Sequence, residues 1–305
     1  MSTEENTPID LRELLALSAQ GTDRFIGESK QGPRGRLFGG HVAAQALIAA
    51  GRTVDAVARG ELRPHSLHAY FLDAGAPDVP IEYAVERVRE GKSFVTRSVR
   101  ASQTGRPIFT VMCSFHGDEP GPAHQLPMPE VPPPESCVDL ESYLALRRAK
   151  MNKPETRFSD PTRPIDLRCI APPEPGVPDP GATTQRFWVR AHGELPDDPL
   201  LHAAIATWAS DYTLLGAMRR PHGGGPGYGR RDLSTASLDH SLWLHRPFRM
   251  DQWLLYDQVS PQTSGGRGLS QGRYYTASGE LVASMCQEGL LRVFDPTKAR
   301  SAKRG

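Results

Sequence analysis

The strongest constraint on the fold is an order of segments that occurs twice along the chain. In each half a strand-like segment precedes a long apolar helix, and several segments with strand-like alternation follow that helix. Two short identities support a duplication. The triplet His65-Ser66-Leu67 recurs as His240-Ser241-Leu242 after 175 residues (240 − 65 = 175), and Met112-Cys113 recurs as Met285-Cys286 after 173 residues (285 − 112 = 173). Two matches at nearly equal offset predict a gene-duplicated fold with two repeats.

The two long helices are expected at residues 41–54 and 200–218, because both segments are rich in Ala and Leu and contain no proline. After the first helix the pattern changes to alternation of apolar and polar residues, in segments 65–72, 80–90, 93–103 and 107–117. One helix followed by an antiparallel meander indicates an α+β layer in which the sheet wraps the helix.

The chain divides into four predicted parts. Residues 1–119 form the N-terminal repeat, and residues 161–298 form the C-terminal repeat with the candidate catalytic residues. Between them, residues 120–160 form a linker with a short helix, because the stretch PGPAHQLPMPEVPPP is too rich in proline for a helix or a central strand. Residues 299–305 form a tail.

Composition and charge exclude several classes of function. Lys and Arg (36) nearly balance Asp and Glu (35), which removes the broad basic field that nucleic-acid binding usually needs. No run of about 18 apolar residues predicts a membrane span, and the four cysteines fit no metal-ligand spacing. The acidic start and the SAKRG ending match neither a secretory nor a peroxisomal signal. We therefore expect a cytoplasmic protein with reduced thiols, no metal and no nucleic-acid partner.

Three polar residues stand in apolar surroundings in the second half. Asp211 lies on the second long helix, Ser237 at the start of a strand and Gln287 at the end of an apolar strand. The motifs of serine hydrolases, P-loop proteins, dinucleotide-binding proteins and zinc proteases are missing from the sequence. An ionised carboxylate on a buried helix is costly unless it is paired or hydrogen-bonded. On residue types alone, each of the three can also be a satisfied structural group.

Eight segments of the chain carry a family resemblance. They are LFGGHVAAQALIAAGRTV, HSLHAYFLDAG, GKSFVTRSV and SQTGRPIF in the first half, and WASDYTLL, SLDHSLWLHRPF, DQWLLYD and ASGELVASMCQEGLLR in the second. Through these segments the chain resembles the acyl-CoA thioesterase II (TesB-type) family over nearly its whole length, the proline-rich stretch and the tails excepted. The resemblance implies a double hotdog fold, in which each of two tandem repeats wraps a long helix in an antiparallel sheet.

The resemblance also implies a hydrolytic site. Its members are Asp211, Ser237 and Gln287, with Ser237 at a position where the best-known members of the family have Thr. Both residue types supply a hydroxyl group, so we expect a modest effect on rate or substrate range. In this mechanism Asp211 is the general base or orients the water, Ser237 and Gln287 bind the same water, and no acyl-enzyme or cofactor is needed. In hotdog enzymes the oxyanion donors are commonly backbone N–H groups at a helix N-terminus.

Other residues are weaker candidates for substrate binding. Gly39 and Gly40 can instead allow a close approach of the helix to the sheet. His65 can be structural, and His240 can fix the start of the strand near Ser237. Arg246 and the Arg230-Arg231 pair can bind the phosphates of coenzyme A or be solvated. These candidates are Gly39, Gly40, His65, His240 and Arg246, with the Arg230-Arg231 pair as a further possibility for phosphates.

The expected function is hydrolysis of fatty acyl-CoA to free fatty acid and CoA. Two alternatives stay open: a hydratase or dehydratase acting on enoyl- or hydroxyacyl-CoA, and an acyl-CoA-binding protein without hydrolytic activity. The first normally needs an Asp/His pair within one repeat, and Asp211 has no such His close by in the sequence. The family resemblance also implies a homo-oligomer, either a dimer or a tetramer.

Overall fold

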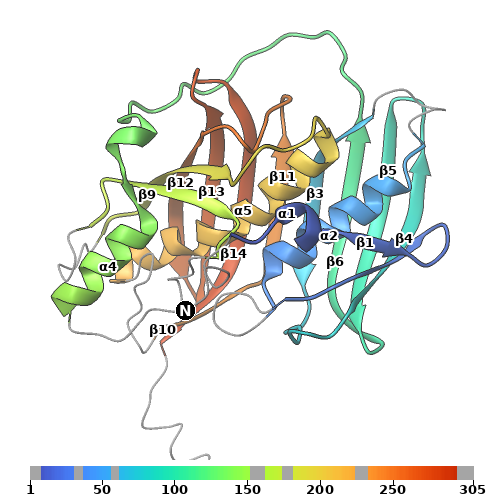
Figure 1. Cartoon of the computed structure of the whole chain (residues 1–305), viewed down its shortest axis with the longest axis horizontal. Helices are drawn as coiled ribbons and strands as arrows, with labels where there is room; N and C mark the ends of the chain where they lie inside the picture. The colour runs from blue at the N-terminus through green and yellow to red at the C-terminus, as the bar shows by residue number, and fades with distance from the viewer. Residues whose placement is uncertain are drawn as a thin grey trace, which may run out of the picture.

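The computed structural model describes residues 8–30, 37–55, 62–151, 162–173, 181–223 and 233–293 (Figure 1). The N-terminal half contains α1 (Leu11–Leu14), β1 (Leu17–Ala19), β2 (Arg24–Gly27), α2 (Gly39–Arg52), β3 (Arg63–Phe71), β4 (Ile81–Glu90), β5 (Phe94–Gln103) and β6 (Arg106–His116). The connecting region contains the 3₁₀ helix η2 (Pro134–Ser136), β7 (Val138–Asp139) and α4 (Leu140–Met151). The C-terminal half contains β8 (Ile165–Ile170), β9 (Thr184–Ala191), α5 (Pro199–Arg219), the 3₁₀ helix η3 (Arg220–His222), β10 (Leu233–Ser237), β11 (Asp239–Leu244), β12 (Leu254–Ser264), β13 (Arg267–Thr276) and β14 (Leu281–Val293).

The strands form one antiparallel sheet, in the order β1-β2-β4-β5-β6-β3-β11-β14-β13-β12-β9-β8-β7, with β10 paired to β14 off this path. The two long helices lie along one face of the sheet. Figure 1 shows α2 beside the strands of the N-terminal half and α5 beside those of the C-terminal half, in agreement with their contacts. This arrangement confirms the predicted α+β class and both predicted long helices, whose four ends all lie within two residues of the expected bounds.

The two halves of the sheet join where β3 pairs with β11. Leu67 lies opposite Leu242, and its neighbours Ser66 and His68 lie opposite Trp243 and Ser241. Leu67 and Leu242 are 175 residues apart (242 − 67 = 175), which is the offset of the repeated triplets. Equivalent residues of the two repeats therefore face each other at the centre of the sheet, as they do in a twofold-symmetric pair. This register agrees with the two-repeat fold predicted from the sequence.

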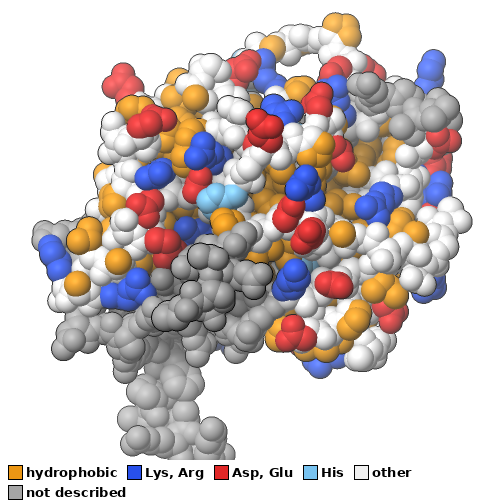
Figure 2. Space-filling model, viewed as in Figure 1, with side chains coloured by type: hydrophobic (Ala, Val, Ile, Leu, Met, Phe, Trp, Pro, Cys, Tyr) orange, Lys and Arg blue, Asp and Glu red, His pale blue; other side chains and the backbone are white. Residues whose placement is uncertain are grey.

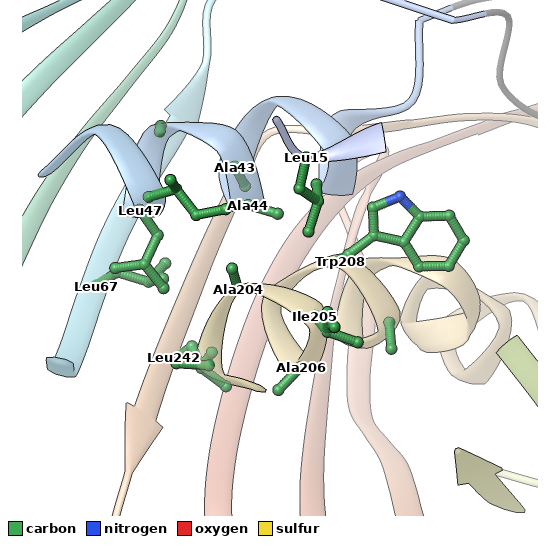
Figure 3. Packing of buried hydrophobic residues seen from close by; sticks show 14 of the residues in the cluster. Leu15, Ala43, Ala44, Leu47, Leu67, Ala204, Ile205, Ala206, Trp208 and Leu242 are labelled. Atoms are coloured by element: carbon green, nitrogen blue, oxygen red, sulfur yellow. The ribbon is translucent and has the colours of Figure 1, made fainter. Parts of the chain in front are cut away.

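The core between the halves is built where α2 crosses α5. Small side chains on both helices allow a close approach, and the leucines of β3 and β11 pack beneath them (Figure 3). A Cβ atom on Gly40 would lie only 2.7 Å from the backbone oxygen of Trp208. Any larger residue at this position would push the helices apart. The labelled residues of this cluster are Leu15, Ala43, Ala44, Leu47, Leu67, Ala204, Ile205, Ala206, Trp208 and Leu242.

The N-terminus of α5 is fixed by ordinary capping. The Asp198 carboxylate accepts hydrogen bonds from the N–H groups of Leu200 (2.9 Å) and Leu201 (3.3 Å). Pro199 occupies the first helical position, where its missing N–H is not needed. The apolar residues that follow are buried over most of the helix.

The proline-rich linker packs on the outer face of the C-terminal half. The Trp188 indole N–H donates to the Pro132 carbonyl (2.8 Å), and the Gln125 amide donates to the Gly279 carbonyl (2.8 Å). Met128 and Val131 pack against a buried cluster that includes Trp188. The short helix expected in this region is α4.

The face of the molecule in Figure 2 carries acidic and basic side chains interspersed, as expected from the net charge of +1. Within the described ranges, no helix has the length and apolarity that crossing a membrane requires.

We expect Arg97→Met to lower the free energy of unfolding by about 2–3 kcal/mol, because a charged hydrogen bonding group is lost from a buried site. Arg97 is fully buried on β5; its Nε donates to Thr53 Oγ1 (2.7 Å) and its Nη2 to the Thr53 carbonyl (3.0 Å), with Glu90 Oε1 at 2.6 Å. Thr53 is the C-cap of α2, where a positive charge is favourable. Urea denaturation measures the effect. Arg100→Met, at an exposed position of the same strand, should change the free energy of unfolding by less than about 0.5 kcal/mol. Equal urea midpoints of unfolding for both variants would contradict the prediction.

Candidate active site

The three polar residues singled out in the sequence lie together in the structure. The Gln287 side-chain amide donates one hydrogen bond to Asp211 Oδ1 (2.5 Å) and one to Ser237 Oγ (3.0 Å). Gln287 is fully buried, and Asp211 is 8% exposed. A carboxylate, a hydroxyl and a carboxamide from distant parts of the sequence therefore converge on one point.

The sheet register explains this convergence. β10 pairs with β14 so that Ser237 lies opposite Gly289, two residues beyond Gln287. On the other side of β14, Gln287 lies opposite Ser270 of β13. The side chain of Gln287 points to the inner face of the sheet, where α5 packs and brings Asp211 to the amide.

The second oxygen of the Asp211 carboxylate faces the other repeat. A Cβ atom on Gly39 would lie 3.0 Å from Asp211 Oδ2 and 2.6 Å from Cε1 of Phe71. Gly39 and Gly40 are the first two residues of α2. The first N–H groups of a helix have no acceptor within the helix, and the helix dipole makes this end attractive to negative charge.

Aromatic rings stand beside this point. The Phe38 ring, directly before Gly39, lies 4.9 Å from the Trp208 ring and 5.9 Å from the Tyr212 ring, measured between centroids. Trp208 and Tyr212 stack on each other at 5.5 Å and flank Asp211 on α5. They give the site a wall of low polarity, in which electrostatic interactions are stronger than in water.

Comparison with known proteins agrees with this geometry. Residues 28–116 match the family model described as the acyl-CoA thioesterase N-terminal domain, and residues 168–290 match the model described as acyl-CoA thioesterase. The human protein acyl-coenzyme A thioesterase 8 is 39% identical over 299 residues, which cover 94% of this chain and 91% of that protein. This chain belongs to the acyl-CoA thioesterase family.

Bacterial proteins are also similar to this thioesterase. Acyl-CoA thioesterase 2 of Haemophilus influenzae is 36% identical, with 93% of this chain and 97% of that protein covered. The crystal structure of acyl-CoA thioesterase II TesB2 from Mycobacterium marinum has a TM-score of 0.75 at 40% identity and covers 93% of this chain and 98% of that one. A hotdog-fold protein from Alicyclobacillus acidocaldarius, at 20% identity and a TM-score of 0.70, supports the fold alone. The predicted TesB-type family, the double hotdog fold and the class of thioester hydrolases are confirmed.

The weaker candidates fall in different places on the thioesterase. Gly39 and Gly40 lie at the site, as described above. His240 is fully buried, and its Nε2 lies 2.8 Å from Ser210 Oγ, next to Asp211 in the chain. Burial lowers the pKa of the His240 imidazole. It therefore stands behind the carboxylate rather than on a surface open to substrate.

His65 and Arg246 are not brought to the three converging residues. His65 Nε2 lies 2.8 Å from Ser114 Oγ, and its ring packs on Phe94 and His116. It is six residues along β3 from Phe71, a separation of roughly 20 Å in an extended strand. Arg246 is partly exposed and lies 3.6 Å from Glu280. The Arg230-Arg231 pair lies outside the described residues.

Sequence reasoning missed Phe38, Phe71 and Ser210. No signal in the sequence marks Phe71 as a neighbour of Gly39, because the contact depends on how β3 crosses the start of α2. Ser210 could have been noted, since it is a second polar residue directly before Asp211 on an apolar helix. Among the described residues, no group of three or more His, Cys, Asp or Glu side chains is arranged to hold a metal ion.

Proposed function

We propose that this thioesterase hydrolyses fatty acyl-CoA by direct attack of a water molecule held by Asp211, Ser237 and Gln287. The observation that carries the proposal is the double hydrogen bond of the Gln287 amide to Asp211 Oδ1 and Ser237 Oγ. Both amide hydrogens are used, so Asp211 and Ser237 both act as acceptors toward Gln287. The Ser237 hydroxyl hydrogen and the second Asp211 oxygen remain for a water molecule between them.

The reaction then balances without a covalent intermediate. The water oxygen attacks the thioester carbon, and its proton passes to the Asp211 carboxylate. The tetrahedral intermediate collapses with cleavage of the C–S bond, and the proton on Asp211 passes to the departing thiolate. The products are a free carboxylic acid and CoA with its thiol.

The negative charge of the tetrahedral intermediate needs hydrogen-bond donors. We assign this role to the backbone N–H groups of Gly39 and Gly40, because these residues begin α2 and Gly39 lies beside Asp211. The positive end of the helix dipole favours the oxyanion there. The site is then composite, with the base from the C-terminal repeat and the donors from the N-terminal repeat.

Gly39→Ala should lower kcat about tenfold. The added methyl group would come within 3.0 Å of the Asp211 carboxylate and would displace the Phe71 ring, so the base would lose its position relative to the donors. Thiol release from an acyl-CoA measures kcat. Gly121→Ala is the matched control, because a Cβ atom at Gly121 meets nothing within 4 Å. Equal kcat for both variants would argue against a role for the start of α2.

A single assay distinguishes the possible activities. The purified protein is given saturated acyl-CoAs of several chain lengths and, separately, an enoyl-CoA, and free thiol is followed with a thiol reagent. We expect thiol release that is equimolar with carboxylic acid. Hydration of enoyl-CoA without thiol release would indicate a hydratase, and tight binding of acyl-CoA without turnover would indicate a binding protein. Size-exclusion chromatography with light scattering tests the proposed dimer or tetramer.

A further inference from the structure

The short segment Ser237–His240 touches the neighbours of both other site residues. Ser237 itself accepts a hydrogen bond from Gln287. The carboxylate of Asp239 accepts a hydrogen bond from the backbone N–H of Glu288 (2.7 Å), the residue after Gln287. His240 contacts Ser210, the residue before Asp211. One segment thus connects the strand that carries the carboxamide with the helix that carries the carboxylate.

The direction of the hydrogen bond between His240 and Ser210 follows from the partners. The Thr207 carbonyl lies 2.9 Å from Ser210 Oγ and accepts its hydrogen in the arrangement we infer, in which Ser210 Oγ accepts from His240 Nε2 at 2.8 Å. This arrangement corresponds to neutral His240 with its hydrogen on Nε2. Burial supports this state, because it lowers the pKa of His240 even though the nearby Asp211 and Asp239 carboxylates act in the opposite direction.

Ser210 is also held from a second direction. The hydroxyl of Tyr256 on β12 donates to the Ser210 backbone carbonyl (2.7 Å), and Tyr256 is fully buried. The turn of α5 that ends in Asp211 is thus fixed through a side-chain oxygen and a backbone oxygen of the same residue. Mid-helix carbonyls ordinarily bond only within the helix, so this second bond is an added constraint.

We propose that Asp239 and His240 are positioning residues for the hydrolytic reaction. His240 holds the turn of α5 before Asp211, and Asp239 holds the backbone of β14 after Gln287. Together they set the distance between the carboxylate and the carboxamide. The inference rests on the proposed function, because it concerns the geometry of Asp211 and Gln287.

The decisive pair of variants is His240→Met and His240→Gln. Methionine removes the N–H donor at similar length, whereas glutamine keeps an N–H that can reach Ser210 Oγ. We expect kcat to fall about tenfold in His240→Met with KM within twofold of the wild-type value, and to recover to within about threefold of wild type in His240→Gln. Ser210→Ala removes the acceptor of the same bond, so combining it with His240→Met should lower kcat no further than either change alone.

A merely structural role would give a different result in the Asp211→Asn background. If His240 acts through Asp211, His240→Met should change the residual rate of Asp211→Asn by less than twofold. A further tenfold loss there, or unchanged kcat for His240→Met in the wild-type background, would overturn the proposal. Should His240→Met fail to fold, Ser210→Ala in both backgrounds gives the same comparison.

Two controls complete the test. His245 Nε2 lies 2.9 Å from Ser284 Oγ, so His245→Met removes a similar His–Ser pair away from the site and should leave kcat unchanged. Asp239→Ala should lower kcat about threefold, while Asp239→Asn keeps an oxygen acceptor for the Glu288 N–H and should stay near wild type; equal rates for these two would refute the part assigned to Asp239. If Asp211→Asn itself retains wild-type kcat, the proposed function fails, which is distinct from a failure confined to His240.

Discussion

Asp211→Asn is expected to lower kcat for thiol release about 10³-fold, within the range of about 10²–10⁴ that general base catalysis contributes. Asparagine has the same shape but cannot take a proton from water. Its side-chain oxygen can still accept the hydrogen bond from the Gln287 amide, so the fold and the local packing should be kept. The measurement is single-substrate kinetics with a saturated acyl-CoA, together with the melting temperature of each protein.

Asp257→Asn is the matched control for that experiment. Asp257 lies on β12 of the same repeat and pairs with Arg186 at 2.7 Å, away from the converging residues. Its loss should leave kcat within about twofold of wild type. Comparable rates for Asp211→Asn and Asp257→Asn would refute the assignment of Asp211 as the base.

Gln287→Leu is expected to lower kcat about 10²-fold. Leucine fills a similar volume but donates to neither Asp211 Oδ1 nor Ser237 Oγ, so both lose the group that holds them in register. A displacement of about 1 Å in a catalytic group can cost about two orders of magnitude in rate. Gln271→Leu, at a partly exposed position of β13, is the control and should keep full activity. A Gln287→Leu enzyme with more than about a third of the wild-type kcat would contradict the prediction.

Those features of the fold that depend on local pattern could be predicted from the sequence. Both long helices follow from apolar runs without proline, and the repeats follow from the matched triplets, which the structure places opposite each other at Leu67 and Leu242. The three converging polar residues were indicated by their apolar surroundings and by the family resemblance. Their hydrogen bonds required the register of β10 on β14, which no local pattern encodes.

The equivalent histidines show why the rest could not be predicted. His65 and His240 are the first residues of the two copies of the triplet. The His65 side chain hydrogen-bonds Ser114 on β6, whereas the His240 side chain is buried against Ser210 of α5. The pairing of β3 with β6 shifts register between Pro64 and Ser66, next to His65. Such an irregularity changes where a side chain points without leaving a trace in the triplet itself. Identical sequence therefore did not mean an identical environment.

The glutamines of the two repeats illustrate the same limit. Gln45 of α2 fills the space above Gly27 of β2, whereas in the other repeat Gln185 of β9 fills the space above Gly216 of α5. Gly27 lies opposite Ile81 at the start of β4, whereas Gln185 lies opposite Gln258, four residues into β12, so the two pairs stand at different places in their repeats. A residue-by-residue comparison of the halves would therefore not predict the second pair from the first.

The contact of Gly39 with Asp211 has a consequence for the symmetry of the two halves. The long helices begin at Gly39 and Pro199, an offset of 160 residues (199 − 39 = 160), so Gly51 stands at the place in α2 that Asp211 holds in α5 (211 − 160 = 51). An assembly of two identical subunits would carry the carboxylate at both places and would form the contact with a helix start twice. In this chain the second place has no carboxylate: a Cβ atom on Gly51 would instead lie 2.5 Å from the Leu200 side chain. Of these two equivalent places, only that of Asp211 therefore carries an acid.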